Sequence, residues 1–543
     1  MSNDGEAINT TCMHKKKKIG EGSYGVVYTG FFKDDKDKKL YAVKRNYKET
    51  TSSWLGNIHE ADVLARLKGC QFIVNLHKMA IHDPFDESNP MTPNLSSKKD
   101  MSEDKLHFIM EYVSTSGDDY LRSEHFSYPN SRLILTQVLL GLHYMHKNKI
   151  IHRDLKPANI LINFSNGVPY AKICDFGMSC NYNRCVPATP GVVTCWYRAP
   201  EICFGHKDYD YASDVWSFGC LVYEFFTQRA WLSGVGDENS KIFNAIVNKL
   251  EEAPSEEDLT YLKSKAYKKL TIKTNDILKG KRTSFGSQLK NRTNIIPEYE
   301  SSMESSLDDL VDLLRQCLQI NPTKRITLDG ILRHKFFSVY GDYISSMLHT
   351  HLTHPFIDQV IINSCKERTW AAVELINIYN TEIARSWFSD IILFHGMDLF
   401  DRYIYWASSA ENDKVELYDS ENELHGKIHT KDETELRLWV CIYVMHKYYC
   451  TLQHPKRWTD FFPQKFLGTR KQEFEQQAEA FEYCLIKNVC KYKVYRETLY
   501  EMFDKFEQKP KGNDIVKLLT YYCGTQNYLG TYEKLFQEAM YSK

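Results

Sequence analysis

Two short polar motifs in a fixed order constrain this chain more than any other feature of its sequence. Residues 151–161 read IHRDLKPANIL, and an Asp-Phe-Gly run begins at Asp175. Asn159 and Asp175 offer the amide and carboxylate oxygens that Mg²⁺ takes together with phosphates. Asp154 is suited to accept or orient the proton of an attacking hydroxyl, and Lys156 to neutralise a migrating phosphoryl group. Each residue alone is common in turns and caps, but the ordered set predicts phosphoryl transfer.

The composition is that of a globular chain with several domains. It has 543 residues, of which 43% are hydrophobic and 26% charged, and this excludes a mainly disordered or collagen-like protein. The net charge is −1, so we expect no direct binding to nucleic acid or to an anionic membrane. We find no apolar run of about 18 residues and no secretory signal. Fifteen cysteines without CxxC pairs predict reduced thiols and an intracellular location, in the cytoplasm, the nucleus or both.

A glycine-rich segment precedes the polar motifs. Residues 19–27 read IGEGSYGVV and lead into a strand-like run. A dinucleotide-binding fold has the same glycine spacing but needs a strand before the glycines, where this chain has four lysines. The order favours a glycine hairpin folded over nucleotide phosphates. The residues expected to line it are Ile19, Gly20, Gly22, Gly25 and Val27.

A lysine and a glutamate follow with a spacing that suggests an ion pair. Lys44 ends a short apolar strand that includes Ala42, and Glu60 lies sixteen residues later. Val63, Leu64 and Leu67 give the stretch around Glu60 a helical apolar stripe. A Lys44–Glu60 pair would hold the lysine against the α- and β-phosphates of a nucleotide.

With these motifs in place, residues 19–337 resemble a eukaryotic-type protein kinase. The resemblance implies a bilobal α+β fold, ATP and Mg²⁺ as cofactors, and protein substrates. Lys156, two residues after Asp154, resembles the serine/threonine class. In this resemblance the roles divide among a catalytic set, a nucleotide-binding set and two metal ligands. They are Asp154, Lys156, Asn159 and Thr194 (catalysis); Ala42, Lys44, Glu60, Met110, Glu111, Val113 and Asp175 (nucleotide); and Asn159 and Asp175 (metal).

The subgroup is indicated by residues 192–201, which read VVTCWYRAPE. They are similar to the segment of cyclin-dependent kinases that shapes a pocket for a proline after the phosphorylated residue. The resemblance places Thr194 against Asp154. It also implies a buried ion pair between Glu201 and Arg325, in which the loss of one partner would strand a charge.

The regulatory residues of this group are only partly present. Thr189 aligns with the activating threonine, whose phosphate is held by three arginines in the family. Arg153 supplies one of them, but His59 and Cys180 stand at the other two positions. Since charge-assisted Arg–phosphate bonds are the strong ones, we expect activity to depend less on a Thr189 phosphate. The implied regulatory residues are Ser23 and Tyr24, where a phosphate would repel ATP, together with Thr189 and Arg153.

The chain changes character near residue 340, and we divide it accordingly. The first part carries the glycine-bearing loops, and the second is poor in glycine and rich in helical patterns. The predicted parts are a tail (1–18), the kinase domain (19–337, with insertions at 83–104 and 250–305), a linker (338–354), an all-α domain (355–505) and a helical extension (506–543).

Residues 355–505 resemble a cyclin box in three places. Residues 390–404 are similar to its second helix and 444–449 to its third, and 482–486 fit its fourth. In cyclins a lysine and a glutamate grip the kinase near the helix of the ion pair, which makes Lys447 and Glu482 the expected contact residues. The resemblance implies that this chain carries its own activating cyclin-like domain.

Several alternatives remain open at this stage. The C-terminal part would instead be an adaptor on a kinase that is active alone, or the whole chain a non-catalytic scaffold. The intact Lys44, Asp154, Asn159 and Asp175 argue against the scaffold. An external cyclin, or a kinase of a host cell, remains a further partner.

Overall fold

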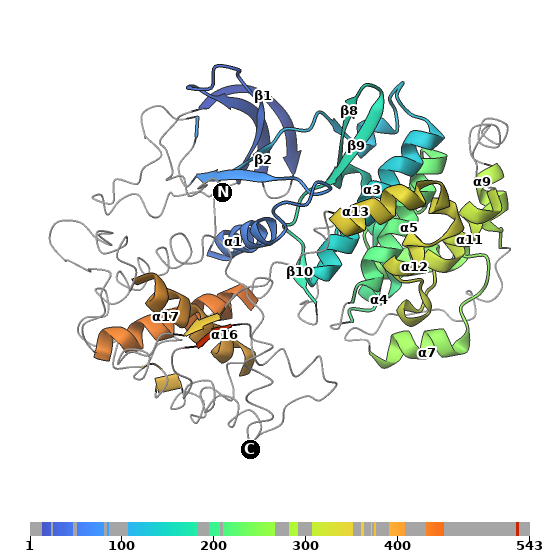
Figure 1. Ribbon diagram of the computed structural model, residues 1–543. Coiled ribbons are helices and arrows are strands. Elements are labelled where there is room, and N and C mark those ends of the chain that lie inside the picture. The colour runs from blue at the N-terminus through green and yellow to red at the C-terminus, as the bar shows by residue number, and fades with distance from the viewer. Residues whose placement is uncertain are drawn as a thin grey trace. The chain divides into compact units, whose positions relative to one another are not determined.

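The computed structural model divides the chain into two compact units (Figure 1). The first consists of residues 1–47, 66–91 and 105–355, and the second of residues 48–65, 92–104 and 356–543. The structure describes residues 13–22, 25–46, 51–80, 84–85, 107–182, 195–206, 210–265, 282–291, 307–350, 360–362, 371, 374–375, 390–407, 431–449 and 528–530.

A five-stranded antiparallel sheet forms the N-terminal lobe of the first unit. Its strand order is β1-β2-β3-β5-β4. The strands are β1 (Met13–Gly22), β2 (Gly25–Phe32), β3 (Tyr41–Asn46), β4 (Leu76–Ala80) and β5 (His107–Glu111). Aromatic and β-branched residues dominate β2, as expected for a strand that buries one face, and Tyr41, Val43, Phe108 and Ile109 supply such residues to β3 and β5.

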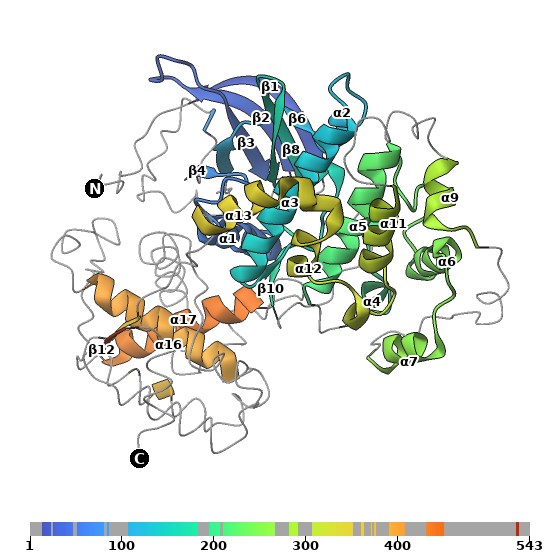
Figure 2. The same cartoon turned by 45° about the vertical axis from the view of Figure 1, so that its right-hand side comes forward.

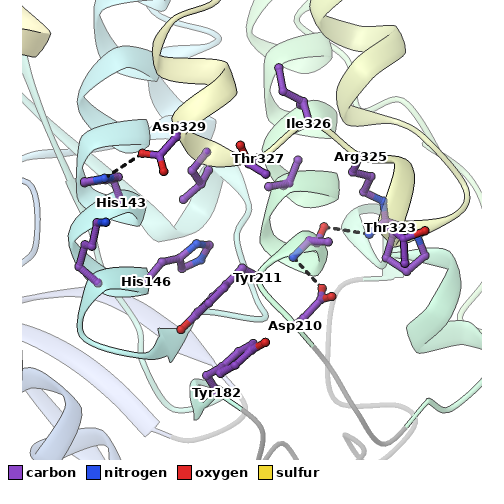
Figure 3. Close-up of a pocket in the computed structure, with 15 residues that line it drawn as sticks. His143, His146, Tyr182, Asp210, Tyr211, Thr323, Arg325, Ile326, Thr327 and Asp329 are labelled. Carbon is purple, nitrogen blue, oxygen red and sulfur yellow. Dashed lines mark hydrogen bonds and ion pairs between the residues drawn. The ribbon is translucent and has the colours of Figure 1, made fainter. Parts of the chain in front are cut away.

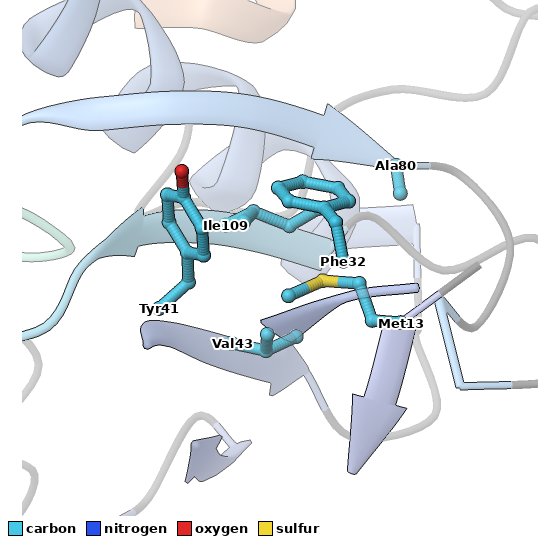
Figure 4. Packing of buried hydrophobic residues seen from close by; sticks show 6 residues of the cluster. All are labelled: Met13, Phe32, Tyr41, Val43, Ala80 and Ile109. Atoms are coloured by element: carbon cyan, nitrogen blue, oxygen red, sulfur yellow. The ribbon is translucent and has the colours of Figure 1, made fainter. Parts of the chain in front are cut away.

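One face of this sheet carries a small apolar core (Figure 4). Val43 and Ile109 are fully buried at its centre. The other members of the cluster are Met13, Phe32, Tyr41 and Ala80. Because Met13 belongs to this core, β1 begins six residues before the predicted domain start, and residues 13–18 are part of the sheet rather than of a tail.

The helical lobe is built around α5 (Ala212–Thr227). Every residue from Ser213 to Thr227 is buried, as in a helix at the centre of a domain. Helices α3 (Tyr128–Lys147) and α11 (Leu307–Cys317) pack against it (Figures 1 and 2). Further helices are α2 (Gly117–Tyr120), α4 (Pro200–Cys203), α6 (Asn239–Lys249), α7 (Glu256–Ser264), α9 (Phe285–Lys290) and α12 (Leu328–Leu332).

Short strands and single turns complete this lobe and carry the polar motifs. The strands are β6 (Thr115–Ser116), β7 (Ile150–Ile151), β8 (Ile160–Ser165), β9 (Val168–Ile173) and β10 (Cys180–Asn181). The 3₁₀ turns are η1 (Pro157–Asn159), η2 (Cys195–Tyr197), η3 (Pro322–Lys324) and η4 (Lys335–Tyr340). The predicted bilobal kinase fold is therefore confirmed for the first unit.

The predicted linker at 338–354 differs from the structure. Its first residues belong to η4, and α13 (Gly341–Thr350) follows directly. Helix α13 packs against α3, with Ile344 buried, and Gln71 donates to Met347 Sδ at 2.7 Å. Thus residues 341–350 are a packed helix, and the predicted insertion at 250–305 likewise contains the helices α7 and α9.

The second unit contains the helix of the expected ion pair and the described C-terminal elements. Its helices are α1 (Thr51–Arg66, whose last residue belongs to the first unit), α16 (Asp390–Ala407) and α17 (Lys431–Tyr449). Helices α16 and α17 pack closely, because a Cβ at Gly396 would lie 2.6 Å from Cγ1 of Ile442.

The same unit also contains two short strands. These are β11 (Val360–Ile362) and β12 (Tyr528–Gly530), which pair antiparallel. The two helices match the predicted helical segments, but the small sheet departs from a purely helical domain and from the helical extension expected over 506–543. No helix in the described part of the chain is long and apolar enough to cross a membrane.

Candidate active site

A buried aspartate holds the backbone of the first polar motif. Asp214, at the start of α5, is fully buried and accepts hydrogen bonds from the amides of His152 and Arg153, both at 2.9 Å. His146 Nε2 lies 2.9 Å from the same carboxylate. Burial opposes ionisation, but these bonds prevail and lower the pKa of Asp214. A fixed anion therefore anchors a loop whose Arg153 adopts a left-handed φ of 70°.

The predicted catalytic residues converge on one carboxylate. Lys156 Nζ lies 2.7 Å from Asp154 Oδ2. Asn159 Nδ2 donates to the backbone oxygen of Asp154 at 2.7 Å and to its Oδ2 at 3.1 Å. Asp154 is buried, so its carboxylate is held in place by charged and amide donors rather than by water. This arrangement gives a substrate hydroxyl one oriented acceptor beside one cation.

The second polar motif brings an acid against the predicted lysine. Lys44 Nζ, at the middle of β3, lies 3.3 Å from Oδ1 of Asp175. The ammonium group of Lys44 holds the pKa of Asp175 below its usual value, so the carboxylate is ionised near neutral pH. His152 joins the two motifs, because its Nε2 lies 3.1 Å from the carbonyl oxygen of Cys174. Phe176 packs against the same imidazole, with ring centroids 5.4 Å apart.

The donor set fits a hard divalent cation. Asp175 supplies an ionised carboxylate, and the Asn159 amide donates through its nitrogen, which leaves its oxygen as the ligand atom. Among the described residues no group of three or more His, Cys, Asp and Glu gathers as a protein-only metal cage. Mg²⁺ does not need one, because it is commonly held by one or two protein oxygens plus substrate phosphates and water.

The N-terminal lobe supplies the nucleotide-facing residues in register. The glycine segment supplies the end of β1 and the start of β2, where Gly22 pairs with Gly25, and Val27 pairs with Lys44 across β2 and β3. Ala42 pairs with Met110 across β3 and β5. The described part of the glycine hairpin thus lies on the same sheet as the lysine, as predicted.

The last residue of β5, Glu111, is held by two contacts of its side chain. Glu111 Oε1 accepts from the amide of Asn75 at 2.7 Å and lies 2.9 Å from Lys172 Nζ. Val113 follows in a short extended connection toward β6. The predicted hinge is therefore a backbone segment whose position is held by side chains at its start.

A buried ion pair in the helical lobe joins α4 to the end of η3. Arg325 donates to both carboxylate oxygens of Glu201 at 2.6 Å. The guanidinium also donates to the backbone oxygens of Ala212 at 2.8 Å and Gln319 at 2.7 Å, and it lies over the Trp216 ring. The predicted Glu201–Arg325 pair is confirmed.

Comparison with known proteins agrees with this geometry. The model of the protein kinase domain matches residues 13–337. The chain belongs to the protein kinase family. Cyclin-dependent kinase G1 of Arabidopsis thaliana is 31% identical over 339 residues, which are 60% of this kinase and 48% of the relative.

Relatives of two groups are similar to this kinase. The mitogen-activated protein kinase SLT2/MPK1 of Saccharomyces cerevisiae is 31% identical over 333 residues, 60% of this kinase and 61% of the relative. Cyclin-dependent kinase 11B of Rattus norvegicus is 29% identical over 328 residues, 59% of this kinase and 64% of the relative. The kinase therefore spans about half the length of the plant relative and under two thirds of the other two.

Several expected residues are not tested by the geometry of the first unit. Glu60 is buried on α1, which belongs to the second unit, so the Lys44–Glu60 pair stays a prediction. Lys447 falls within the bounds of α17, but its side chain lies outside the described part of the chain. The other predicted residues that lie outside the described residues are Ser23, Tyr24, Thr189, Thr194 and Glu482.

Two residues with contacts between distant segments were not singled out from the sequence. They are His146, which lies against Asp214, and Glu224, which accepts from Tyr197. The Tyr197 hydroxyl donates to Glu224 Oε2 at 2.6 Å, and burial raises the pKa of Glu224 to about 7. Asp214 begins the run DVWSFG, which the resemblance to protein kinases places at the start of the central helix, and it lies in the first turn of α5.

Proposed function

We propose that this protein is a Mg²⁺·ATP-dependent serine/threonine kinase with a preference for proline after the target residue, and that its own C-terminal unit activates it. The observation that carries the kinase chemistry is the carboxylate of Asp154, fixed by Lys156 and Asn159. A serine or threonine hydroxyl would direct its proton at Asp154. Lys156 would neutralise the transferred phosphoryl group, and Lys44 would bind the remaining phosphates.

Preference for a following proline is supported by the residues after Thr194. Trp196 Nε1 donates to the backbone oxygen of Val235 at 3.0 Å. Arg198 donates to Asn239 Oδ1 at 2.7 Å and pairs with Asp237 at 3.1 Å. These contacts hold η2 against the α5–α6 connection, which is what a preformed pocket for a rigid proline ring requires.

Activation from within the chain is supported by the division into units. Helix α1 carries Glu60 and belongs to the second unit, together with α16 and α17. An element that positions Glu60 relative to Lys44 would control phosphate binding, since kinases need this ion pair for activity. The C-terminal residues would act as the activating partner through α1.

The connection from α13 to the C-terminal part of the second unit is short. Met347 of α13 contacts Gln71, five residues beyond the end of α1 at Arg66. The five residues 351–355 then span at most about 17 Å. So short an attachment raises the local concentration of one part around the other, which favours action within one chain over action between chains.

The kinase activity is tested with the purified full chain, made without any external cyclin. Three peptides that differ in one residue, carrying Ser-Pro, Ser-Ala or Tyr-Pro, are incubated with ATP and Mg²⁺. We expect phosphorylation of the Ser-Pro peptide at least about tenfold faster than of the others, a difference of about 1.4 kcal/mol in transition-state binding. Equal rates on Ser-Pro and Ser-Ala would remove the proline preference, and preference for Tyr-Pro would remove the serine/threonine assignment.

Internal activation is tested by a double variant of the full chain. Lys447→Ala with Glu482→Ala should lower kcat while ATP binding is retained, and Lys431→Ala with Glu473→Ala is the control with the same charge change. Residues 1–355 alone should be inactive. Full activity of both the double variant and the truncated chain would make the C-terminal part an adaptor. Activity that appears only with an added cyclin would replace the internal partner by an external one.

A further inference from the structure

Three aromatic rings form a continuous stack beside the catalytic loop (Figure 3). The rings of Tyr182 and Tyr211 lie 4.4 Å apart and are nearly parallel, at 10°. His146 stacks on the other face of Tyr211, also at 4.4 Å, with an angle of 28°. The three residues come from three segments: Tyr182 follows β10, Tyr211 precedes α5, and His146 lies in the last turn of α3.

The stack ends on the carboxylate that holds the catalytic loop. His146 Nε2 lies 2.9 Å from Asp214 Oδ2. The same carboxylate accepts from the amides of His152 and Arg153, next to the catalytic Asp154. The imidazole, this carboxylate and the two amides are therefore joined in one hydrogen-bonded network.

The other end of the stack lies at the start of the segment that precedes Thr189. The backbone around Tyr182 is bonded to the strand before the catalytic loop: its amide donates to Lys149 O at 2.9 Å, and the two-residue strands β7 and β10 pair through Cys180 and Ile151. Each stacked ring pair adds a stabilisation beyond that of its buried area, and this stabilisation is comparable to that of a hydrogen bond.

Packing accounts for one part of the stack, because both tyrosines contact the small buried cluster of Ile151 and Cys180. Both tyrosines are only half-buried. They border a cavity of about 380 Å³ between the end of α3, the start of α5 and the loop before α12, which His143, Lys147 and Asp329 also line. Rings that leave one side open to a cavity contribute less apolar burial than core residues, while their mutual geometry stays well defined.

We propose that Tyr182 and Tyr211 are positioning residues, which transmit the placement of the segment after β10 through His146 to Asp214 and the catalytic loop. The inference rests on the phosphoryl transfer proposed above. Its consequence is that the rings affect the catalytic step and not the binding of nucleotide. Asp154 belongs to the loop that Asp214 holds, whereas Lys44, which is proposed to bind the nucleotide phosphates, lies on β3.

The test uses the full chain with Tyr182→Ala and Tyr211→Ala, each compared with the corresponding Phe variant. We expect the Ala variants to lower kcat about tenfold, the equivalent of about one lost stack, with KM for Mg·ATP within about twofold. The Phe variants keep the ring and should restore kcat. 4-Methylphenol, which replaces the missing side chain, should partly restore Tyr211→Ala.

The matched control is Tyr128→Ala. Tyr128 stacks on Phe226 at 5.7 Å and 9°, in the same unit but away from the catalytic loop. It should lower the melting temperature and leave kcat unchanged. An unchanged kcat in both Ala variants, or an equal loss of kcat in Tyr128→Ala, would overturn the proposal.

A second measurement does not depend on catalysis. Hydrogen exchange at the amides of His152 and Arg153 is followed in the full chain. We expect faster exchange in Tyr211→Ala than in Tyr128→Ala, because only the first variant frees the carboxylate that these amides bind. If the unaltered chain phosphorylates no peptide, the proposed function fails, but hydrogen exchange still shows whether the stack positions the loop. If exchange is equal in both variants, the stack has no positioning role.

Discussion

The ion pair between Glu201 and Arg325 allows a prediction in which the two partners behave differently. The Arg325 side chain is fully buried and that of Glu201 is 5% exposed. Breaking a buried pair by removal of one partner typically costs about 3–5 kcal/mol of unfolding free energy. We propose Glu201→Leu and Arg325→Met, which keep apolar volume and remove one charge each.

The expected loss of unfolding free energy differs between the two variants, because each leaves a different charged group without its partner. In Glu201→Leu the guanidinium stays charged at any accessible pH, but it keeps its bonds to the carbonyls of Ala212 and Gln319, so we expect the lower end, about 3 kcal/mol. In Arg325→Met a buried carboxylate remains, and it can take up a proton. Its pKa then rises above the unfolded value, so the unfolding free energy increases as pH falls, by up to about 1.4 kcal/mol per pH unit.

The assay is urea unfolding of the full chain at pH 7.5 and pH 5.5, followed by tryptophan fluorescence. Relative to the unaltered protein, Arg325→Met should recover stability at pH 5.5, and Glu201→Leu should not. The double variant should be closer to the unaltered protein than either single variant, because it strands no charge. Losses under about 1 kcal/mol, or the same pH dependence in both single variants, would refute the reasoning.

Three other predictions concern single residues. Burial raises the pKa of Glu224 from 4.5 to about 7. Ionisation of this buried group therefore lowers the free energy of unfolding by up to about 3 kcal/mol as pH rises between these values. In urea unfolding, Glu224→Gln should stabilise the protein at pH 8 and leave its stability unchanged at pH 4.5. Asp154→Asn should lower kcat about 10²–10⁴-fold with little change in nucleotide affinity, which steady-state kinetics and nucleotide titration measure. Gly396→Ala should cost about 1–3 kcal/mol in thermal unfolding, because the new Cβ meets Ile442 at 2.6 Å; an unchanged melting temperature would contradict the close approach of α16 and α17.

The catalytic centre could be predicted because its chemistry is encoded in short runs. Asp154, Lys156 and Asn159 lie within six residues, so one turn brings their side chains together wherever that loop is placed. The Glu201–Arg325 pair joins residues 124 positions apart, and only the family resemblance could reveal it.

Contacts without a local pattern could not be predicted. Tyr182 and Tyr211 are single aromatic residues with no periodicity, and their stack depends on how β10 and α5 are placed. The change of character near residue 340 predicts a linker where α13 forms. Its sequence contains Gly, two Ser and Thr, which are weak helix formers, and packing against α3 overrides that preference. The three-residue strands β11 and β12 pair across more than 160 residues, beyond the range of any local signal.

Helix α13 also bears on how strong the contact has to be in the proposed activation of the kinase by its own C-terminal unit. With only residues 351–355 between this helix and the second unit, the local concentration of one partner around the other is on the order of mM or higher. An interface with a dissociation constant of about 100 µM would then be almost fully formed in the intact chain, yet the same two pieces mixed at about 1 µM would remain apart. Permanent attachment thus removes selection for affinity at this surface, and such a surface is free to lose the residues by which separate cyclins capture their kinases.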